Sequence, residues 1–518
     1  MKLAVSSMIS KIDNFSAKNL GLSVGELMRK SGEAVADTVR SRVKAPSAVV
    51  VLAGKGNNGG DGYASAVALM DEYDVTVIDV FGLGQKNEAG KYFLELYKER
   101  GGKLEIYEPT DTIHKMIKSS ACVIDAVFGT GFVGEMPEKL RPLAITVREA
   151  VETHKIAIDV PLGINPDNGS VSDFVISVEA TVALSFIKPG IISYPARAYV
   201  GEIVYDSLGL PEKEIDDNFN FKYHMVDADM LRALLPKRAD NTNKGSFGKL
   251  LMITGSEKYR GAAHLSCEAA LRGGVGLVTY AGCEALVGEL SQKYPEVVYK
   301  EIKPISDLSD SDIEEICELS RKHTATLIGS GSDNTDGLLR LTIALLSSEG
   351  GTLILDADSI NALAGIGEEG IDAIRRSNRS VVVTPHPLEF ARLIGDEVAS
   401  VQLHRLERAE KFANETGAIV VLKGASTIIT NGENVYINAS GSSALAKAGS
   451  GDVLAGLIAA MCAQHSMTDT IAATVSVYLH GAAGDSLAKE YSSYGVTPSD
   501  LPKRIAEKIS SVEKNDFL

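Results

Sequence analysis

The sequence predicts an α/β protein with two three-layer domains, each a mostly parallel sheet covered by helices on both faces. Two observations predict this architecture. Short β-branched strands alternate with helical stretches in both halves of the chain, which is the pattern of parallel sheets. The length of 518 residues also exceeds what one hydrophobic core usually organises. Composition agrees, because 45% hydrophobic residues, 49 Gly and only 16 Pro are typical of glycine-turned α/β enzymes.

The first half contains the first set of expected elements. We expect strands at residues 48–52, 75–80, 121–124 and 155–160. Helices lie between them, for example at residues 62–70. A helix expected over residues 20–39 is partly periodic, with apolar side chains at Leu27, Met28, Ala34 and Val35. Such a face packs on the core or binds a second subunit. Because closed homo-oligomers are common among soluble enzymes, we expect one here.

The pattern loosens between residues 210 and 244, where a charged stretch precedes a short helical segment at 227–235 that ends at Pro236. We therefore expect a first domain at 1–212, a linker at 213–225 and a second domain at 226–518. Strands of the second half are expected at 249–254, 352–355, 380–383 and 418–422. Asn431-Gly432, between strands 427–430 and 435–438, predicts a hairpin.

Charge and targeting signals restrict the class of partner. A formal charge of −16 repels nucleic acid and anionic lipid, so a phosphate-bearing small molecule must be held locally. No apolar run approaches the roughly 20 residues of a membrane helix, and the first residues lack the pattern of a signal peptide. We expect a cytoplasmic protein. The five cysteines form no CxxC pair, which favours buried reduced thiols over a zinc or redox site.

A glycine-rich segment, Gly54-Lys-Gly-Asn-Asn-Gly-Gly-Asp-Gly62, directly follows the strand at 48–52 and precedes a helix. Its first six residues match GxGxxG, which suits a pyrophosphate at a helix N-terminus and keeps a dinucleotide dehydrogenase open. A tight strand-to-helix turn gives the same pattern. Asn57, Asn58 and Asp61 add amide and carboxylate groups that an ordinary dinucleotide turn does not need, so contact with a substrate or a cation is expected.

Two later strand ends carry carboxylates, Asp125 in Asp-Ala-Val-Phe-Gly-Thr-Gly131 and Asp159 in Ile-Asp-Val-Pro-Leu-Gly-Ile164. Either one alone can be a helix cap or a loop anchor. Because the carboxyl ends of parallel strands converge on one crevice, the two aspartates and the first loop together predict a site.

The most informative stretch of the second half is Ala448-Gly-Ser-Gly-Asp452, which runs into an apolar helix at 453–463. A glycine turn at a helix N-terminus gathers amides into an anion hole, and Asp452 can accept a proton from a hydroxyl nucleophile. The segment can also be a simple helix cap. Phosphoryl transfer is favoured by Leu422-Lys-Gly-Ala-Ser-Thr427, Gly329-Ser-Gly331 and Thr384-Pro-His-Pro-Leu-Glu389, which follow other strands.

Motifs that would indicate other nucleotide enzymes are missing. There is no GxxxxGK[ST], which excludes a P-loop NTPase, and no HRD or DFG of protein kinases. The pattern instead looks like the ribokinase-type fold. His386, between two prolines, can contact substrate or be structural, and Glu389 can be a helix-start carboxylate.

Taken together, the motifs resemble the bifunctional NAD(P)H-hydrate epimerase and ADP-dependent dehydratase family, in which a Rossmann-like YjeF N-terminal domain precedes a ribokinase-like domain. In the first half the resemblance rests on residues 54–62, 125–131 and 158–164. In the second half it rests on Asn243-Lys-Gly-Ser-Phe-Gly248, Gly255-Ser256, Tyr259, Gly261-Ala-Ala263, Pro385-His-Pro387, Lys423-Gly424 and residues 449–452. It covers nearly the whole chain.

The resemblance implies an isomerase site in the first domain, with Asp159 as the catalytic acid/base. The implied contacts of the hydrated nicotinamide are Asn57, Asn58, Gly59, Gly60, Asp61, Gly129, Thr130, Gly131, Phe132, Val133, Gly134, Glu135 and Asp159. It also implies K⁺ at Asn58 and Asp125. Leu162 stands where the family usually has a serine, so only its backbone is available to the cation.

For the second domain the resemblance implies a lyase that uses ADP and Mg²⁺, with Asp452 as the base. The implied ADP contacts are Lys423, Gly424, Ala425, Ser426, Thr427, Gly449, Ser450 and Gly451. The implied contacts of the hydrate are Ala263, Gly331, His386 and Asp452.

Three alternatives remain at this point. A vitamin or sugar kinase shares the ribokinase-type motifs, and a dehydrogenase is supported by GxGxxG alone. A nucleotide-sensing or scaffold module is a third reading, because YjeF-like domains occur in an RNA-decapping scaffold. Intact Asp125 and Asp159 and the acidic charge count against the scaffold. The loops themselves do not decide between ADP and ATP.

Overall fold

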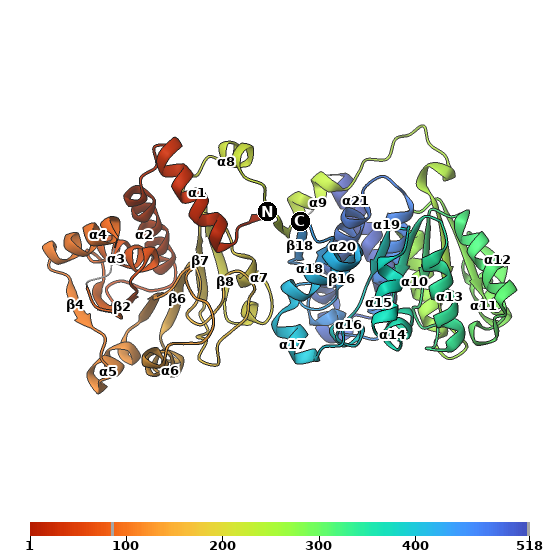
Figure 1. The fold of residues 1–518 in the computed structure, drawn as a ribbon. Coiled ribbons are helices and arrows are strands. Elements are labelled where there is room, and N and C mark those ends of the chain that lie inside the picture. Colours follow the sequence, from red (N-terminus) through yellow and green to blue (C-terminus); the bar gives the residue numbers. More distant parts are fainter. Residues whose placement is uncertain (84–86, 515–518) are drawn as a thin grey trace. The chain divides into compact units, whose positions relative to one another are not determined.

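The computed structural model describes residues 1–83 and 87–514. It comprises two compact units, one from Lys2 to Tyr223 and one from His224 onward that also includes Met1 (Figure 1). The chain passes from the first unit to the second between Tyr223 and His224. Among the described residues, no helix combines the length and apolar composition needed to cross a membrane.

The first unit contains a seven-stranded sheet among the described residues, in the order β4-β3-β2-β5-β6-β7-β8, and each pair of neighbouring strands is parallel. The strands of this unit are β1 (Lys2–Leu3), β2 (Ala48–Ala53), β3 (Asp74–Asp79), β4 (Lys103–Ile106), β5 (Cys122–Ala126), β6 (His154–Ile158), β7 (Ala180–Leu184) and β8 (Glu202–Asp206). The helices are α1 (Ser6–Asn19), α2 (Val24–Arg40), α3 (Asn57–Leu69), α4 (Glu88–Glu99), α5 (Asp111–Ser119), α6 (Arg141–Glu149), α7 (Pro189–Ile192) and α8 (Glu212–Asn218), with 3₁₀ turns at Glu138–Leu140 and Ala196–Ala198.

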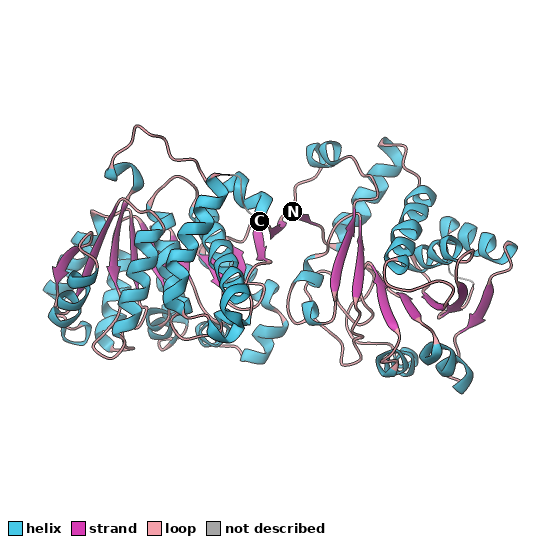
Figure 2. Cartoon of the chain, turned by 180° about the vertical axis from the view of Figure 1, so that it is seen from behind, coloured by secondary structure: helices cyan, strands magenta, loops and turns pink. Residues whose placement is uncertain are grey.

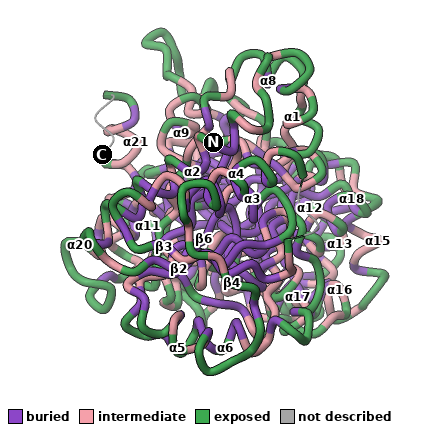
Figure 3. Tube along the Cα trace, turned by 90° about the vertical axis from the view of Figure 1, so that its left-hand side faces the viewer, coloured by how far each residue is buried: buried purple, intermediate pink, exposed green. Residues whose placement is uncertain are grey.

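Alternation along the strands produces the three layers of this unit. Val49 and Val51 of β2 belong to a buried cluster with α2, α3 and α4, whereas Val50 and Leu52 belong to a cluster with α5 and α6. Each face of the sheet is therefore covered by its own helices, as the sequence predicts. Figure 3 shows the strands β2, β3 and β6 buried inside these layers, and the loops between elements largely exposed.

The second unit contains a larger sheet in the order β9-β18-β17-β16-β15-β14-β13-β10-β11-β12. Its strands are β9 (Tyr223–Val226), β10 (Lys249–Ile253), β11 (Leu277–Gly282), β12 (Val298–Glu301), β13 (Ala325–Ile328), β14 (Thr352–Leu355), β15 (Val381–Val383), β16 (Ile419–Leu422), β17 (Ile428–Thr430) and β18 (Val435–Asn438). The strands from β16 to β12 pair in parallel, and β16, β17 and β18 pair antiparallel, which confirms the predicted hairpin. Figure 2 shows that helices flank the strands in both units.

Helices cover this sheet as well. They are α9 (Ala228–Leu234), α10 (Arg260–Arg272), α11 (Glu284–Lys293), α12 (Asp310–Arg321), α13 (Asp336–Ser347), α14 (Asp358–Ala364), α15 (Glu368–Arg375), α16 (Pro387–Ile394), α17 (Val398–Leu403), α18 (Arg405–Thr416), α19 (Ser450–Ala463), α20 (Asp469–Gly495, interrupted at Ser492) and α21 (Leu501–Glu513). The 3₁₀ turns are Lys244–Phe247, Ile305–Asp307, Ser443–Leu445 and Pro498–Asp500.

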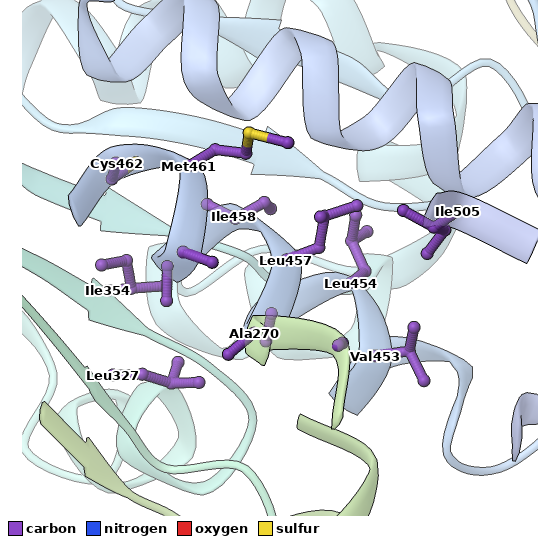
Figure 4. Packing of buried hydrophobic residues seen from close by; sticks show 14 of the residues in the cluster. Ala270, Leu327, Ile354, Val453, Leu454, Leu457, Ile458, Met461, Cys462 and Ile505 are labelled. Carbon is purple, nitrogen blue, oxygen red and sulfur yellow. The ribbon is translucent and has the colours of Figure 1, made fainter. Parts of the chain in front are cut away.

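Helix α19 is buried almost all round, because nearly every residue after its first turn is apolar. Leu457 and Ile458 lie between Leu327 and Ile354 of the sheet and Ile505 of α21 (Figure 4). Burying each such side chain stabilises the fold by about 1.5–3 kcal/mol. This packing fixes the N-terminus of α19, which carries Asp452.

The two largest differences from the sequence-based boundaries are at helix starts. The helix expected from residue 20 begins at Val24, because Ser23 caps it by accepting a hydrogen bond from the amide of Glu26 at 3.2 Å. The helix expected from residue 62 begins at Asn57. Asn57 to Asp61 therefore lie in the first turn of α3 rather than in a loop ahead of it.

Candidate active sites

The first candidate site lies where the strand order of the first unit reverses, between β2 and β5. Asn58 follows β2, Asp125 lies at the end of β5, and Asp159 follows β6. Since these neighbouring strands are parallel, their carboxyl ends open on one crevice. The topology thus brings the three predicted residues to the same edge of the sheet.

Two of the three glycines that matched GxGxxG have a structural explanation. A Cβ on Gly54 would lie 1.9 Å from the carbonyl oxygen of Val127, and a Cβ on Gly59 would lie 2.0 Å from the oxygen of Gly54. Both positions require glycine because backbone packs on backbone there. The motif therefore gives no specific support to a dinucleotide dehydrogenase.

Asn58, Gly129 and Asp159 form the centre of this site. A Cβ on Gly129 would lie 3.3 Å from Oδ1 of Asn58 and 3.3 Å from Oδ2 of Asp159, so glycine leaves the space between them open. Asn58 is 7% exposed, and its Nδ2 has no hydrogen-bond partner among the described residues. A buried amide in this state indicates a ligand as its partner.

Asp159 is held in a strained backbone conformation, with a φ of +68°. Its Oδ1 accepts a hydrogen bond from the amide of Leu184 at 3.3 Å and pairs with the ammonium group of Lys188. Sequence analysis did not identify Lys188, although a lysine inside the apolar stretch Phe186-Ile-Lys-Pro189 was a usable signal.

Two further carboxyl groups act on this pair. Burial raises the pKa of Asp61 well above its usual range, the nearby charge of Asp159 adds to the effect, and the hydroxyl of Ser31 opposes it. Burial also raises the pKa of Asp13 to about 6, where Lys188 lowers it and Asp159 raises it. Asp13, on α1, was missed by sequence analysis because only tertiary packing brings that helix here.

Other residues of the predicted hydrate set differ in their surroundings. Asn57 accepts a hydrogen bond from Asn87, which caps α4. Phe132 is buried against Phe128, with ring centroids 5.6 Å apart. The remaining loop residues are more open, with Val133 76% exposed, Thr130 half-buried, and Gly131, Gly134 and Glu135 exposed.

Asp125 is buried and accepts backbone hydrogen bonds from Val127 at 3.1 Å and Leu162 at 2.6 Å. Burial raises its pKa to about 7, and the two amides oppose this shift. The side chain of Leu162 packs into the apolar cluster beneath the sheet, so only its backbone faces Asp125.

The second candidate site is a connected network at the carboxyl ends of β10, β13, β14, β15 and β16. Its centre is Asp356, which is 1% exposed and directly follows β14. Asp356 pairs with the ammonium of Lys423 at 2.9 Å and accepts hydrogen bonds from Ser330 at 2.8 Å and Thr384 at 2.7 Å. Sequence analysis missed Asp356, although it follows a predicted strand in the same way as Asp125 and Asp159.

Lys423 extends from β16 to the N-terminus of α19. Its Nζ lies 3.5 Å from the position that a Cβ on Gly451 would take. Burial, followed by the charge of Asp356, raises the pKa of Asp452 to about 7, and Lys423 lowers it. A cation, the amides of a helix N-terminus and a carboxyl group thus meet at one point, as phosphoryl transfer requires.

The turn that begins α19 is fixed by close packing. Gly449 has a φ of +98°, and a Cβ there would lie 2.6 Å from the side chain of Leu265. Nε2 of buried His480 lies 3.2 Å from the hydroxyl and 3.1 Å from the carbonyl oxygen of Ser450. Burial lowers the pKa of His480 to about 4, so the ring is neutral and can donate to that carbonyl.

The predicted hydrate residues of this unit also converge. The amide of Gly255 donates to Ser330 at 2.7 Å. A Cβ on Gly255 would lie 2.7 Å from Cβ of Ala263, and one on Gly331 would lie 2.7 Å from Cβ of Ala262. Ala263 and Gly331 are therefore joined to Asp356 through Ser330.

His386 has a structural role in addition to any contact with substrate. Its Nδ1 accepts from the amides of Leu388 and Glu389 at 3.1 Å, and Glu389 accepts from the amide of His386 at 2.7 Å, which caps α16. Burial raises the pKa of Glu389 to about 7.

The predicted nucleotide loop at 423–427 is supported from below by Arg405, a buried residue that sequence analysis did not identify. Its guanidinium donates to the carbonyl oxygens of Leu422 at 3.1 Å and Lys423 at 3.2 Å. Ser426 has a φ of +52°, and Thr427 donates to Gly424 at 2.9 Å. Gly424 and Ala425 are exposed at the surface of the loop.

Comparison with known proteins matches both units. A family model described as YjeF-related protein N-terminus matches residues 24–190, and one described as NAD(P)H-hydrate dehydratase matches residues 250–507. A crystal structure of the ADP/ATP-dependent NAD(P)H-hydrate dehydratase from Bacillus subtilis is 28% identical, with a TM-score of 0.48, and the match covers 56% of this chain and 97% of that one.

Two curated relatives match over nearly their full length. The bifunctional NAD(P)H-hydrate repair enzyme of Moorella thermoacetica is 31% identical, covering 97% of this chain and 95% of the relative. The enzyme of the same name from Thermofilum pendens is 32% identical, covering 100% of this chain and 98% of the relative. The chain belongs to the family of bifunctional NAD(P)H-hydrate repair enzymes.

Proposed function

We propose that the chain repairs hydrated nicotinamide dinucleotides. The first unit interconverts the R and S forms of NAD(P)H hydrate. The second unit dehydrates the S form to NAD(P)H at the expense of ADP, with release of AMP and phosphate. The observation that carries the proposal is two separate acid–base sites, around Asp159 and Asp452, in one chain that is similar over its full length to bifunctional repair enzymes.

In the second unit, Asp452 accepts the proton of the C6 hydroxyl while the oxygen of that hydroxyl attacks the terminal phosphate of the nucleotide. The amides at the start of α19 and the ammonium of Lys423 stabilise the negative charge that develops on the transferred phosphoryl group. Phosphate then leaves C6 while the ring nitrogen supports the cation, and loss of a proton from C5 restores the double bond. Esterification replaces hydroxide, a poor leaving group, with phosphate.

Magnesium fits the charge of this site. Asp356, Asp452 and Glu389 surround the single ammonium of Lys423, which leaves surplus negative charge. No group of three or more His, Cys, Asp or Glu that could hold a metal occurs within residues 1–83 and 87–514, so Mg²⁺ would be held mainly by nucleotide phosphates and water, with Glu389 the nearby carboxylate. When bound, the ion neutralises phosphate charge.

In the first unit, Asp159 gives a proton to the departing hydroxyl, which leaves as water while the ring nitrogen shares the positive charge. Water then adds to either face of the ring, and Asp159 takes one proton back from it. Potassium fits Asn58, Asp125 and the backbone carbonyl of Leu162, which are oxygen ligands around a buried carboxylate. The Leu162 carbonyl already accepts from the amide of Ile176 at 3.1 Å and retains a second lone pair. The ion would compensate the buried charge of Asp125.

The choice of ADP over ATP, assembly as a homo-oligomer and a cytoplasmic location stay predictions. The residues that would contact the nucleotide are Lys423, Gly424, Ala425, Ser426, Thr427, Gly449, Ser450 and Gly451.

The test mixes purified protein and Mg²⁺ with an R/S mixture of hydrated NADH, adds ADP or ATP separately, and follows recovery of the reduced-nicotinamide absorbance. We expect complete recovery with ADP. Recovery of the S fraction alone would remove the epimerase from the proposal. A stable phosphorylated product in place of orthophosphate would instead indicate a vitamin or sugar kinase.

A further inference from the structure

Lys188 is among the most deeply buried charged side chains of the first unit, at 1% exposed, and precedes α7 directly. Its Nζ pairs with Oδ1 of Asp159 and donates to the carbonyl oxygen of Leu184 at 3.0 Å. A lysine rarely stays buried unless it is paired, because taking an ammonium out of water is costly. The pair with Asp159 therefore accounts for the position of Lys188.

The two oxygens of Asp159 have different surroundings. Oδ1 receives both the ammonium of Lys188 and the amide of Leu184, at 3.3 Å for the amide. Oδ2 lies 3.3 Å from the point above Gly129 that a Cβ would occupy, and Oδ1 of Asn58 lies 3.3 Å from the same point. The backbone of Asp159 is also fixed, since its amide donates to Val182 at 2.8 Å.

We propose that Lys188 is a positioning residue of the epimerase site, which holds Oδ1 of Asp159 and so presents Oδ2 to the hydrated nicotinamide as the oxygen that exchanges the proton. This inference rests on the proposed epimerase activity. A carboxylate free to rotate would offer either oxygen. With Oδ1 occupied, the reacting oxygen and its direction are set before substrate binds.

The charges around Lys188 give it a second reason to be retained. Asp13 from α1 and Asp61 from α3 both interact electrostatically with Asp159 and with Lys188. Three carboxyl groups thus share this region with the ammonium. Removing the ammonium would take away the cation that these carboxyl groups share and would free Oδ1 of Asp159, so the carboxylate would no longer be held in one orientation.

The experiment measures epimerisation without nucleotide, from pure R or pure S hydrate, in wild type, Lys188→Met and Lys188→Arg. We expect Lys188→Met to lower kcat about 100-fold, in the range that a misplaced acid–base group costs, and to change KM less than about threefold. Lys188→Arg keeps the charge but moves its contact, so we expect a loss of about tenfold in kcat. Dehydration of S hydrate with nucleotide, in the same samples, measures the amount of chain whose second unit is active. Thermal denaturation reports whether the first unit is folded.

A double-mutant cycle separates positioning from general structure. If Lys188 acts through Asp159, Asp159→Asn/Lys188→Met is no slower than Asp159→Asn alone. Lys155→Met is the matched control, because Lys155 is a half-buried lysine that bonds the carbonyls of Ala150 and Thr153 at the opposite end of β6. We expect it to lower thermal stability and leave epimerisation at the wild-type rate.

Two results would overturn the inference: a wild-type kcat in Lys188→Met, or losses in the double mutant that multiply. A fall in kcat accompanied by loss of the thermal unfolding transition of the first unit would mean that Lys188→Met is misfolded. The test would then rest on Lys188→Arg, in which a fall in kcat with little change in KM supports the inference and a wild-type kcat contradicts it. If wild type itself does not interconvert the R and S hydrates, the proposed epimerase fails, which is a separate outcome.

Discussion

Each unit places a lysine–aspartate ion pair at the carboxyl edge of a parallel sheet, but the two pairs stand in different relations to the proposed base. In the first unit, Lys188 pairs with Asp159 itself. In the second, Lys423 pairs with Asp356, while the pKa of Asp452 is raised to about 7 by burial and by Asp356. The proposed base is an aspartate in both units, but its electrostatic surroundings differ.

The difference matches the two proposed reactions. A carboxyl with a pKa near neutrality suits the removal of a hydroxyl proton during phosphoryl transfer, because it is both basic and substantially ionised. A carboxylate fixed by an ammonium suits an exchange of protons at one defined position on the ring. Environment, rather than residue identity, separates the two roles.

Among the tests of this difference between the two sites, we expect the largest change in rate from Asp452→Asn. Removing a well-placed base typically lowers the rate by about 10²-fold to 10⁴-fold. We expect a loss of this size in nucleotide-dependent dehydration of S hydrate, measured by absorbance. Epimerisation of the same sample should stay at the wild-type rate, and equal loss of both activities would mean that the two sites are not independent.

The second prediction concerns stability of the second unit. Lys423→Met leaves Asp356 buried and unpaired with a cation, which typically costs about 3–5 kcal/mol in the free energy of unfolding. Urea denaturation measures the change. Lys300→Met is the control, because it breaks the exposed pair of Lys300 with Glu315 and should cost less than about 1 kcal/mol. Similar losses in the two variants would contradict the special role of the buried pair.

Much of the fold and the centre of each site could be predicted, because the signals are local in sequence. Asp125, Asp159 and Asp452 each adjoin a strand end or a helix start, and strands at the switch point of a parallel sheet must converge. Asp356 carried the same signal and could have been found. The missed residues define the electrostatics of the sites rather than their location.

The remaining residues lacked a local signal. Asp13 lies on α1, which reaches the first site only through tertiary packing, and His480 lies in the middle of the long helix α20. Lys188 did carry a local signal, as a lysine within an apolar stretch, but its partner Asp159 lies 29 positions away in sequence. Pattern and propensity describe neighbours in the chain, so partners of this kind appear only once the fold is assembled.

The third prediction is a pH dependence of dehydration in the second unit. Because burial raises the pKa of Asp452 to about 7, the carboxyl is protonated below that pH and cannot accept the hydroxyl proton. We expect kcat/KM for dehydration to fall roughly tenfold per pH unit below about 7 and to level off above it. The pKa of Glu389 is also raised to about 7 by burial, so the profile is repeated in Glu389→Gln. Disappearance of the acidic limb in that variant would assign the limb to Glu389 instead.

The smallest expected effect is the response to potassium, and it should appear only in the first unit. Asp125 is a buried carboxylate whose pKa is raised to about 7, so a cation beside it would stabilise its ionised form. We expect KCl to raise the epimerisation rate roughly fivefold over choline chloride of equal ionic strength, an effect of about 1 kcal/mol. Asp125→Asn should abolish this response. An equal response of dehydration, or persistence of the response in Asp125→Asn, would place the cation elsewhere.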